Sequence, residues 1–133
     1  MLVVDSSVWV DYFNGAQAHH AELLDQLLAR GEIRIVVPDL VLFEVLRGFR
    51  QERDLRTARA LMEGLSIEAT MGEDTALAAT EHYRNLRSRG HTVRSAIDVL
   101  VATFCIERDY ALLHNDGDYD AFELHRGLRV WRQ

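Results

Sequence analysis

Short apolar runs alternate along the chain with longer segments that have the residue spacing of helices. The runs have the length and aliphatic character of buried strands, and they fall at residues 2–4, 33–37, 66–69, 111–114 and 128–131. Caps, glycine stops and apolar residues three or four apart predict helices at residues 6–13, 20–30, 39–49, 55–65, 73–89, 95–109 and 119–126. This alternation predicts parallel strand pairing, and therefore an α/β sandwich with a central parallel sheet and helices on both faces.

Length and composition narrow the class of protein. The 133 residues fit one domain, residues 1–133, and 48% hydrophobic with 27% charged residues is typical of a globular chain. No apolar run has the length of a membrane span, and the N-terminus lacks the pattern of a signal peptide. The single cysteine, Cys105, has apolar neighbours in a predicted helix, which favours a buried reduced thiol and a cytoplasmic location.

Charge and residue usage exclude several function classes. The net charge of −6 argues against unspecific nucleic-acid binding by the whole surface. All 15 basic residues are arginine, so a phosphate-accepting signalling domain that relies on a lysine does not fit. An EF-hand in "DGDYDA" fails because Ala121 and Gly127 occupy the positions of the required glycine and glutamate. The stretch "DSS" lacks the D-x-D of a dehalogenase-like phosphatase, and nothing indicates a serine–histidine–aspartate triad.

Four acids are the candidate chemistry. Asp5 ends the first predicted strand and Asp116 follows the fourth, and ligands of open parallel sheets bind outside the carboxyl ends of strands. Glu44 and Asp98 each interrupt an apolar helical segment. Because converging carboxylates repel one another, a cation is the natural partner, and hard oxygen ligands select Mg²⁺ or Mn²⁺ over zinc.

Each acid also has a structural interpretation when taken alone. Asp5 can cap the helix that follows, and Asp98 stands three residues after Ser95 in a capping-box-like spacing. Glu44 can pair with a nearby arginine, and Asp116 can be a turn residue. The set favours a metal site more than any single member does, because the predicted topology brings all four acids to one edge of the sheet.

Four motifs follow one another along the chain: "VVDSSVWVDYF", "FEVLRG", "RSAIDVLVA" and "LLHNDGDYDAF". In this order they resemble the motifs of PIN-domain ribonucleases, and in particular of VapC-like toxins from prokaryotic toxin–antitoxin pairs. The resemblance covers nearly the whole chain and implies a PIN-like three-layer sandwich with a parallel sheet of about four to five strands. It also implies an acidic metal site whose positions match Asp5, Glu44, Asp98 and Asp116, with Asp118 as a further acid near the metal.

Two neighbouring positions are supporting candidates under the same resemblance. A hydroxyl residue follows the first acid in the family, and Ser7 is the preferred match for binding a metal-bound water, with helix capping as the alternative. Many family members carry threonine, serine or arginine before the fourth acid, whereas this chain has Asn115, which still hydrogen-bonds water or phosphate. Asp120 is expected to face water or to cap the last helix.

The resemblance implies a reaction and partners. It implies a Mg²⁺- or Mn²⁺-dependent endoribonuclease that cuts RNA with water as the nucleophile and leaves a 5′-phosphate. It further implies a cognate antitoxin that holds the toxin inactive, and a homodimer. A non-catalytic PIN-like module that binds RNA or a protein partner is the alternative.

Two groups of arginines are candidates for RNA contact. The group around "RGFRQERDLRTAR" is spaced by three and makes a diffuse basic flank, whereas the favoured group leads into the helix of Asp98 and comprises Arg84, Arg87, Arg89 and Arg94. A solvated face with local ion pairs is the alternative for any one of them. Trp9, Tyr12 and Phe13 share a helical face, which favours core or subunit-interface packing over base stacking.

Overall fold

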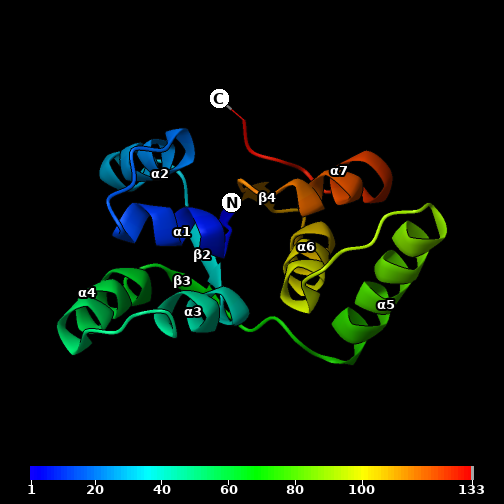
Figure 1. Ribbon diagram of the computed structural model, residues 1–133, viewed down its shortest axis with the longest axis horizontal. Coiled ribbons are helices and arrows are strands. Elements are labelled where there is room, and N and C mark those ends of the chain that lie inside the picture. Colours follow the sequence, from blue (N-terminus) through cyan, green and yellow to red (C-terminus); the bar gives the residue numbers. More distant parts are fainter. Residues whose placement is uncertain (133) are drawn as a thin grey trace.

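A computed structural model describes residues 1–132 and contains a four-stranded, fully parallel sheet (Figure 1). The strands are β1 (Leu2–Val4), β2 (Ile35–Pro38), β3 (Ser66–Glu68) and β4 (Ala111–Leu113). The helices are α1 (Ser6–Phe13), α2 (His19–Arg30), α3 (Asp39–Leu46), α4 (Glu52–Glu63), α5 (Glu73–Ser88), α6 (Ala96–Arg108) and α7 (Asp120–Arg126), with a 3₁₀ turn η1 (Gly117–Tyr119) before α7. The predicted α/β class is therefore confirmed.

The strand order β3-β2-β1-β4 fixes the layers of the fold. The chain steps from β1 to β2 to β3 in one direction and then crosses back over the sheet to reach β4. Because parallel crossovers are right-handed, α1–α4 cover one face of the sheet and α5 and α6 cover the other. In Figure 1 these two groups of helices lie on opposite sides of the strands. The direction of winding changes between β1 and β4, and a binding crevice is expected at this switch point.

The core lies between the sheet and its helices. Leu2, Val3 and Val4 are completely buried, and α6 contributes Phe104 and the only cysteine, Cys105, to the same core. Burial raises the pKa of the Cys105 thiol, as expected for an inert core residue. Trp9 is also fully buried and stacks on Phe13 with ring centroids 5.7 Å apart, so its predicted core role is confirmed.

The fifth predicted strand is wrong in extent. Residues 128–131 pair with β4 only through an isolated bridge between Leu112 and Val130. Gly127, with a φ of 80°, ends α7, and the Leu128 amide donates to Phe122 instead of to a strand. The sheet therefore has four strands within the described residues. The third helix also ends earlier than predicted, at Leu46, and α4 begins earlier, at Glu52.

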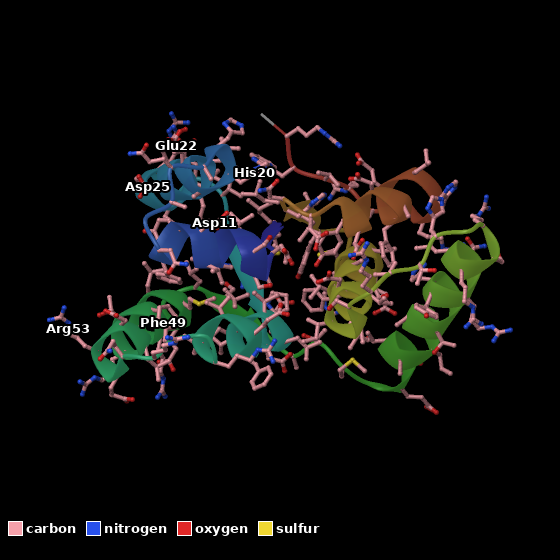
Figure 2. The ribbon with its side chains drawn as sticks, viewed as in Figure 1. Asp11, His20, Glu22, Asp25, Phe49 and Arg53 are labelled. Carbon is pink, nitrogen blue, oxygen red and sulfur yellow. The ribbon has the colours of Figure 1, made fainter. Side chains whose placement is uncertain are left out.

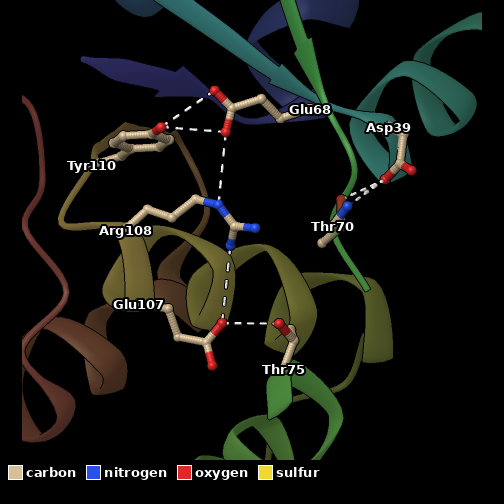
Figure 3. Close-up of polar contacts among 7 residues, drawn as sticks. All are labelled: Asp39, Glu68, Thr70, Thr75, Glu107, Arg108 and Tyr110. Atoms are coloured by element: carbon tan, nitrogen blue, oxygen red, sulfur yellow. Dashed lines mark hydrogen bonds and ion pairs between the residues drawn. The ribbon is translucent and has the colours of Figure 1, made fainter. Parts of the chain in front are cut away.

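A charged network joins β3, α5 and α6 on the side of the sheet that α6 covers (Figure 3). Arg108 lies 3.6 Å from Glu68 and 3.9 Å from Glu107. Thr75 donates to the Glu107 carboxylate at 2.9 Å, and the Tyr110 hydroxyl lies 3.2 Å from the Glu68 carboxylate. We call these five residues the Arg108 network. None of the helices in residues 1–132 has the length and apolar character needed to cross a bilayer.

Candidate metal centre at the carboxyl edge of the sheet

Asp5 stands at the junction of β1 and α1, where it caps the helix. One carboxylate oxygen, Oδ2, accepts from the Ser7 amide at 3.2 Å and from the Ser7 hydroxyl at 2.6 Å. The other, Oδ1, accepts from the Tyr119 hydroxyl at 2.7 Å. Asp5 is only 2% exposed, so these contacts fix its carboxylate inside the fold. Asp5 therefore both caps α1 and lies in the candidate site, so the two interpretations are compatible.

Asp98 lies in the first turn of α6, and its backbone and side chain serve different purposes. Its amide donates to the hydroxyl of the capping residue Ser95 at 3.4 Å. Its carboxylate contacts the Tyr119 hydroxyl at 3.2 Å and is 8% exposed. The predicted capping box therefore exists at the backbone and leaves the carboxylate free to face the site.

Asp116 and Asp118 come from the turn after β4. The Asp118 amide donates to Asp116 Oδ1 at 2.9 Å, and the Asp116 amide donates to His114 Nδ1 at 3.1 Å. Burial lowers the pKa of His114, which suits a neutral ring that accepts at Nδ1. One carboxylate oxygen from each of Asp98, Asp116 and Asp118 lies within 4.8 Å of the others. This trio of oxygens has the spacing of a cation site.

Glu44, on α3, lines the same cleft as Asp5, Asp98 and Asp116. Its carboxylate accepts a short hydrogen bond from the Ser6 hydroxyl at the start of α1. It makes no ion pair with an arginine among residues 1–132, so the alternative interpretation of Glu44, a helical pairing with a nearby arginine, is not observed there. A cleft of about 430 Å³ opens between these elements and is lined by Asp5, Ser6, Ser7, Val10, Asp11, Glu44, Ser95, Asp98 and Asp116.

The structure thus brings together the four acids that the sequence singles out, and it places the other candidates around them. Asp118 belongs to the close trio, whereas Asn115 is exposed and lines a neighbouring pocket of about 280 Å³ instead of the cleft. Asp120 is exposed, as predicted. The Ser7 hydroxyl donates to Asp5 Oδ2, and Asp5 rather than Ser7 caps α1, so Ser7 supports the capping carboxylate.

Sequence reasoning missed Tyr119. This residue ends η1, is completely buried, and places its hydroxyl between Asp5 and Asp98. Its ring packs against His114 with centroids 4.9 Å apart. The sequence offered one faint signal, an aromatic hydroxyl three residues after the fourth acid, and that signal did not distinguish a site residue from a core residue.

The electrostatics of the site are dominated by the negative charge of its acids. Burial, followed by the neighbouring Asp5 and Asp116, raises the pKa of Asp98 to about 7, with Glu44 adding to the effect. No arginine or histidine within residues 1–132 forms an ion pair with any of the five acids. An all-oxygen donor set with unbalanced negative charge fits a hard divalent cation such as Mg²⁺ or Mn²⁺.

The two groups of arginines differ in their placement. The loop that joins α5 to α6 lies beside Gly117 and Asp118, where residues 90–93 line a shared pocket of about 280 Å³. Arg89 and Arg94 flank this loop, and both are exposed. In contrast, Arg53 points outward from α4 at the edge of the molecule (Figure 2). Arg84 and Arg87 lie on α5, where Arg87 packs over the Tyr83 ring at 5.5 Å.

Comparison with known families agrees with this geometry. The family model described as "PIN domain" matches residues 2–123 of the sequence, and the chain therefore belongs to this family. Within the family it is similar to VapC ribonucleases: Ribonuclease VapC11 from Mycobacterium tuberculosis is 32% identical over 123 residues, which is 90% of either chain.

Solved structures support the same fold. VapBC2 from Rickettsia felis, bound to a DNA fragment from its promoter, superposes with a TM-score of 0.77 at 16% identity, covering 99% of this chain and 98% of the other. Mycobacterium tuberculosis VapC20, described as a sarcin–ricin loop cleaving toxin, superposes with a TM-score of 0.72 at 17% identity, covering both chains completely. The expected PIN fold is confirmed.

Proposed function

We propose that this protein is a Mg²⁺- or Mn²⁺-dependent endoribonuclease that acts as the toxin of a toxin–antitoxin pair. One observation carries the proposal: buried and half-buried carboxylates converge on one cleft with no basic side chain of the described residues paired to them. Similarity to proteins named VapC ribonucleases supports RNA as the substrate class.

The residues have distinct roles in this proposal. Asp98, Asp116 and Asp118 supply the oxygens that hold the cation, and Asp5 completes the ligand set from the end of β1. A divalent ion bound there supplies positive charge beside the scissile phosphate and an activated water. Glu44, oriented by the Ser6 hydroxyl, lines the same cleft and accepts a proton from the attacking water in this proposal.

The arginines beside the site serve substrate binding in this proposal. Guanidinium groups bind phosphates and stack on unpaired bases. Arg89 and Arg94 flank the loop next to Asp118, with Arg84 and Arg87 further along α5. In this proposal they bind RNA phosphates beside the acidic cleft.

The family relationship extends the proposal to protein partners. Similar structures include VapBC assemblies from Rickettsia felis and Salmonella typhimurium, each bound to DNA. We propose a cognate antitoxin for this chain on that basis, and a homodimer as its toxin state.

The test is RNA cleavage by the purified protein. We expect cutting with Mg²⁺ or Mn²⁺, loss of cutting with a chelator, and loss in Asp5→Asn and Asp98→Asn. Asp25→Asn on the exposed side of α2 is the matched control and should cut normally.

The chemistry of the cut ends completes this test. Water attack predicts 5′-phosphate ends, and a 2′,3′-cyclic phosphate would contradict the proposed mechanism. Tight RNA binding without cutting, unchanged by metal, would favour the non-catalytic module instead. Mapping transcript 5′ ends after brief expression identifies the target.

A further inference from the structure

We propose that Tyr119 is a positioning residue that ties Asp5 to Asp98 and so sets the spacing of the metal-site carboxylates. The proposal rests on the function proposed above and concerns how the site is built. Tyr119 contacts both acids through a single oxygen, at 2.7 Å to Asp5 Oδ1 and 3.2 Å to Asp98 Oδ1.

The place of Tyr119 in the fold makes its hydroxyl a fixed point. The side chain has no exposed surface, and its ring packs on His114 in the continuous core. The residue ends η1, a turn that Asp116 caps by accepting from the Asp118 amide. A ring held this way has little rotational freedom, so its hydroxyl is a rigid reference for flexible carboxylates.

The contacts made by Tyr119 join two parts of the site that no other hydrogen bond of residues 1–132 joins directly. Asp98 belongs to the close trio with Asp116 and Asp118, whereas Asp5 lies outside that trio. Within residues 1–132, the Tyr119 hydroxyl is the one group that hydrogen-bonds to both Asp5 and Asp98. It therefore links the acid that ends β1 to the acid that begins α6.

The carboxylate oxygens of Asp5 and Asp98 that accept hydrogen bonds indicate how Tyr119 orients the two acids. The Tyr119 hydroxyl lies against Oδ1 of both acids and shares its one proton between them, while the Ser7 hydroxyl donates to Oδ2 of Asp5. The second oxygen of Asp98 has no hydrogen-bond partner among the described residues, so it remains available to a ligand. Groups that orient metal ligands from behind typically affect metal affinity by about 10- to 100-fold.

The experiment compares two tyrosine-to-phenylalanine variants in metal binding. Tyr119→Phe removes only the bridging oxygen. Tyr110→Phe is the matched control, because it removes a hydroxyl that contacts the Glu68 carboxylate outside the cleft. We expect Tyr119→Phe to weaken Mn²⁺ binding, measured by calorimetry, about 10-fold, and Tyr110→Phe to leave it unchanged.

RNA cleavage provides the second readout. Tyr119→Phe should shift the Mn²⁺ concentration at half-maximal rate upward by about the same factor, with recovery of the rate at saturating Mn²⁺ and little change in the KM for RNA. An affinity within twofold of the unmodified protein overturns the inference. If the unmodified protein binds neither ion, the proposed function falls as well, and the unmodified arm alone reveals that.

A spectroscopic measurement keeps the inference falsifiable if Tyr119→Phe does not fold. The chain has four tyrosines, so incorporation of 3-fluorotyrosine gives few signals, and phenylalanine substitution of Tyr12, Tyr83 and Tyr110 assigns the Tyr119 signal by elimination. We expect the chemical shift of the Tyr119 fluorine to change during a Mg²⁺ titration, with a midpoint equal to that of ion binding. The chemical shift of the Tyr110 fluorine should not change. A Tyr119 resonance that does not move at saturating Mg²⁺ overturns the inference.

Discussion

The protein contains two clusters of acids, and within residues 1–132 only one of them includes a basic side chain that balances its charge. In the Arg108 network, Glu68 and Glu107 share one guanidinium, which also stacks over the Phe104 ring at 4.1 Å. In the cleft, Asp5, Asp98 and Asp116 face one another without a basic partner among the described residues. Each cluster has a tyrosine hydroxyl against a carboxylate, so the guanidinium is the main difference.

This difference shows which acids stabilise the fold and which depend on something outside it. A network that contains its own counter-charge is complete as soon as the chain folds. In the cleft, burial and then the repulsion from Asp5 and Asp116 raise the pKa of Asp98 to about 7, and a proton or an added cation relieves both effects. The two clusters should therefore respond oppositely to the removal of an acid.

The largest expected effect is on catalysis. Asp98→Asn should reduce RNA cleavage by roughly 1,000-fold or more, because loss of a ligand removes several kcal/mol of transition-state stabilisation. Glu107→Gln, a comparable substitution in the Arg108 network on the same helix, should cut RNA at the normal rate. Initial rates at saturating Mn²⁺ measure both. Equal losses in the two variants would remove the distinction between the clusters.

The pH dependence of stability gives the next largest effect. The pKa of Asp98 is about 7 in the folded protein against 3.8 for the free group, so between these values the folded state holds a proton that the unfolded state has released. Without metal, Asp98 therefore makes the free energy of unfolding decrease as pH rises through this window, by at most about 1.4 kcal/mol per pH unit.

Asp98→Asn isolates this contribution. The variant should be about as stable as the unmodified protein near pH 4 and more stable by roughly 2–4 kcal/mol at pH 8 without metal. Mn²⁺ should stabilise the unmodified protein more at pH 8 than at pH 5.5. Urea unfolding at several pH values measures both. If the difference in stability between the variant and the unmodified protein does not change with pH, the pKa of Asp98 is not raised in the metal-free protein.

Removal of the guanidinium from the Arg108 network should have a smaller effect. Arg108→Ala leaves Glu68 and Glu107 without their shared counter-charge and removes the packing on Phe104. The side chain is 34% exposed, so solvent screens part of the loss, and we expect a destabilisation of about 1–2 kcal/mol. Urea unfolding measures it, and cleavage should be unaffected. A loss of activity without a loss of stability would mean that the network serves the site.

The smallest expected effect concerns substrate binding. Arg89→Ala with Arg94→Ala should raise the KM for RNA by about 3- to 10-fold with kcat nearly unchanged, because two phosphate contacts are lost. The salt dependence of binding should become shallower by about 1.4 in log–log slope. The pair Arg53→Ala and Arg56→Ala on α4 is the control. A larger effect of the α4 pair would place the RNA on the other flank.

The sequence was sufficient for the order of elements because hydrophobic spacing is a local property. It located the strands that end at Asp5 and before Asp116, and the helices that carry Glu44 and Asp98. It failed at residues 128–131, whose apolar pattern suits a strand although only the Leu112–Val130 bridge forms. Strand length depends on how much of the partner strand is available, which the pattern does not encode.

The candidate site was predictable in its acids but not in their contacts. Acids at strand ends stand out in a sequence, whereas the hydrogen bonds of Ser6 to Glu44 and of Tyr119 to Asp5 join residues 38 and 114 positions apart. Such contacts depend on the three-dimensional packing of several elements. Tyr119 has the pattern of an ordinary core aromatic, and only the direction of its hydroxyl shows otherwise.

The pairing of β4 with β1 has a consequence for protein synthesis. The ribosome releases β4 after the other three strands, and Asp116, Asp118 and Tyr119 all follow it in the chain. A nascent polypeptide that already contains Asp5, Glu44 and Asp98 therefore still lacks Asp116 and Asp118, two of the five acids of the site. The chain must therefore be synthesised past Asp118 before the three carboxylate oxygens of the close trio can come together.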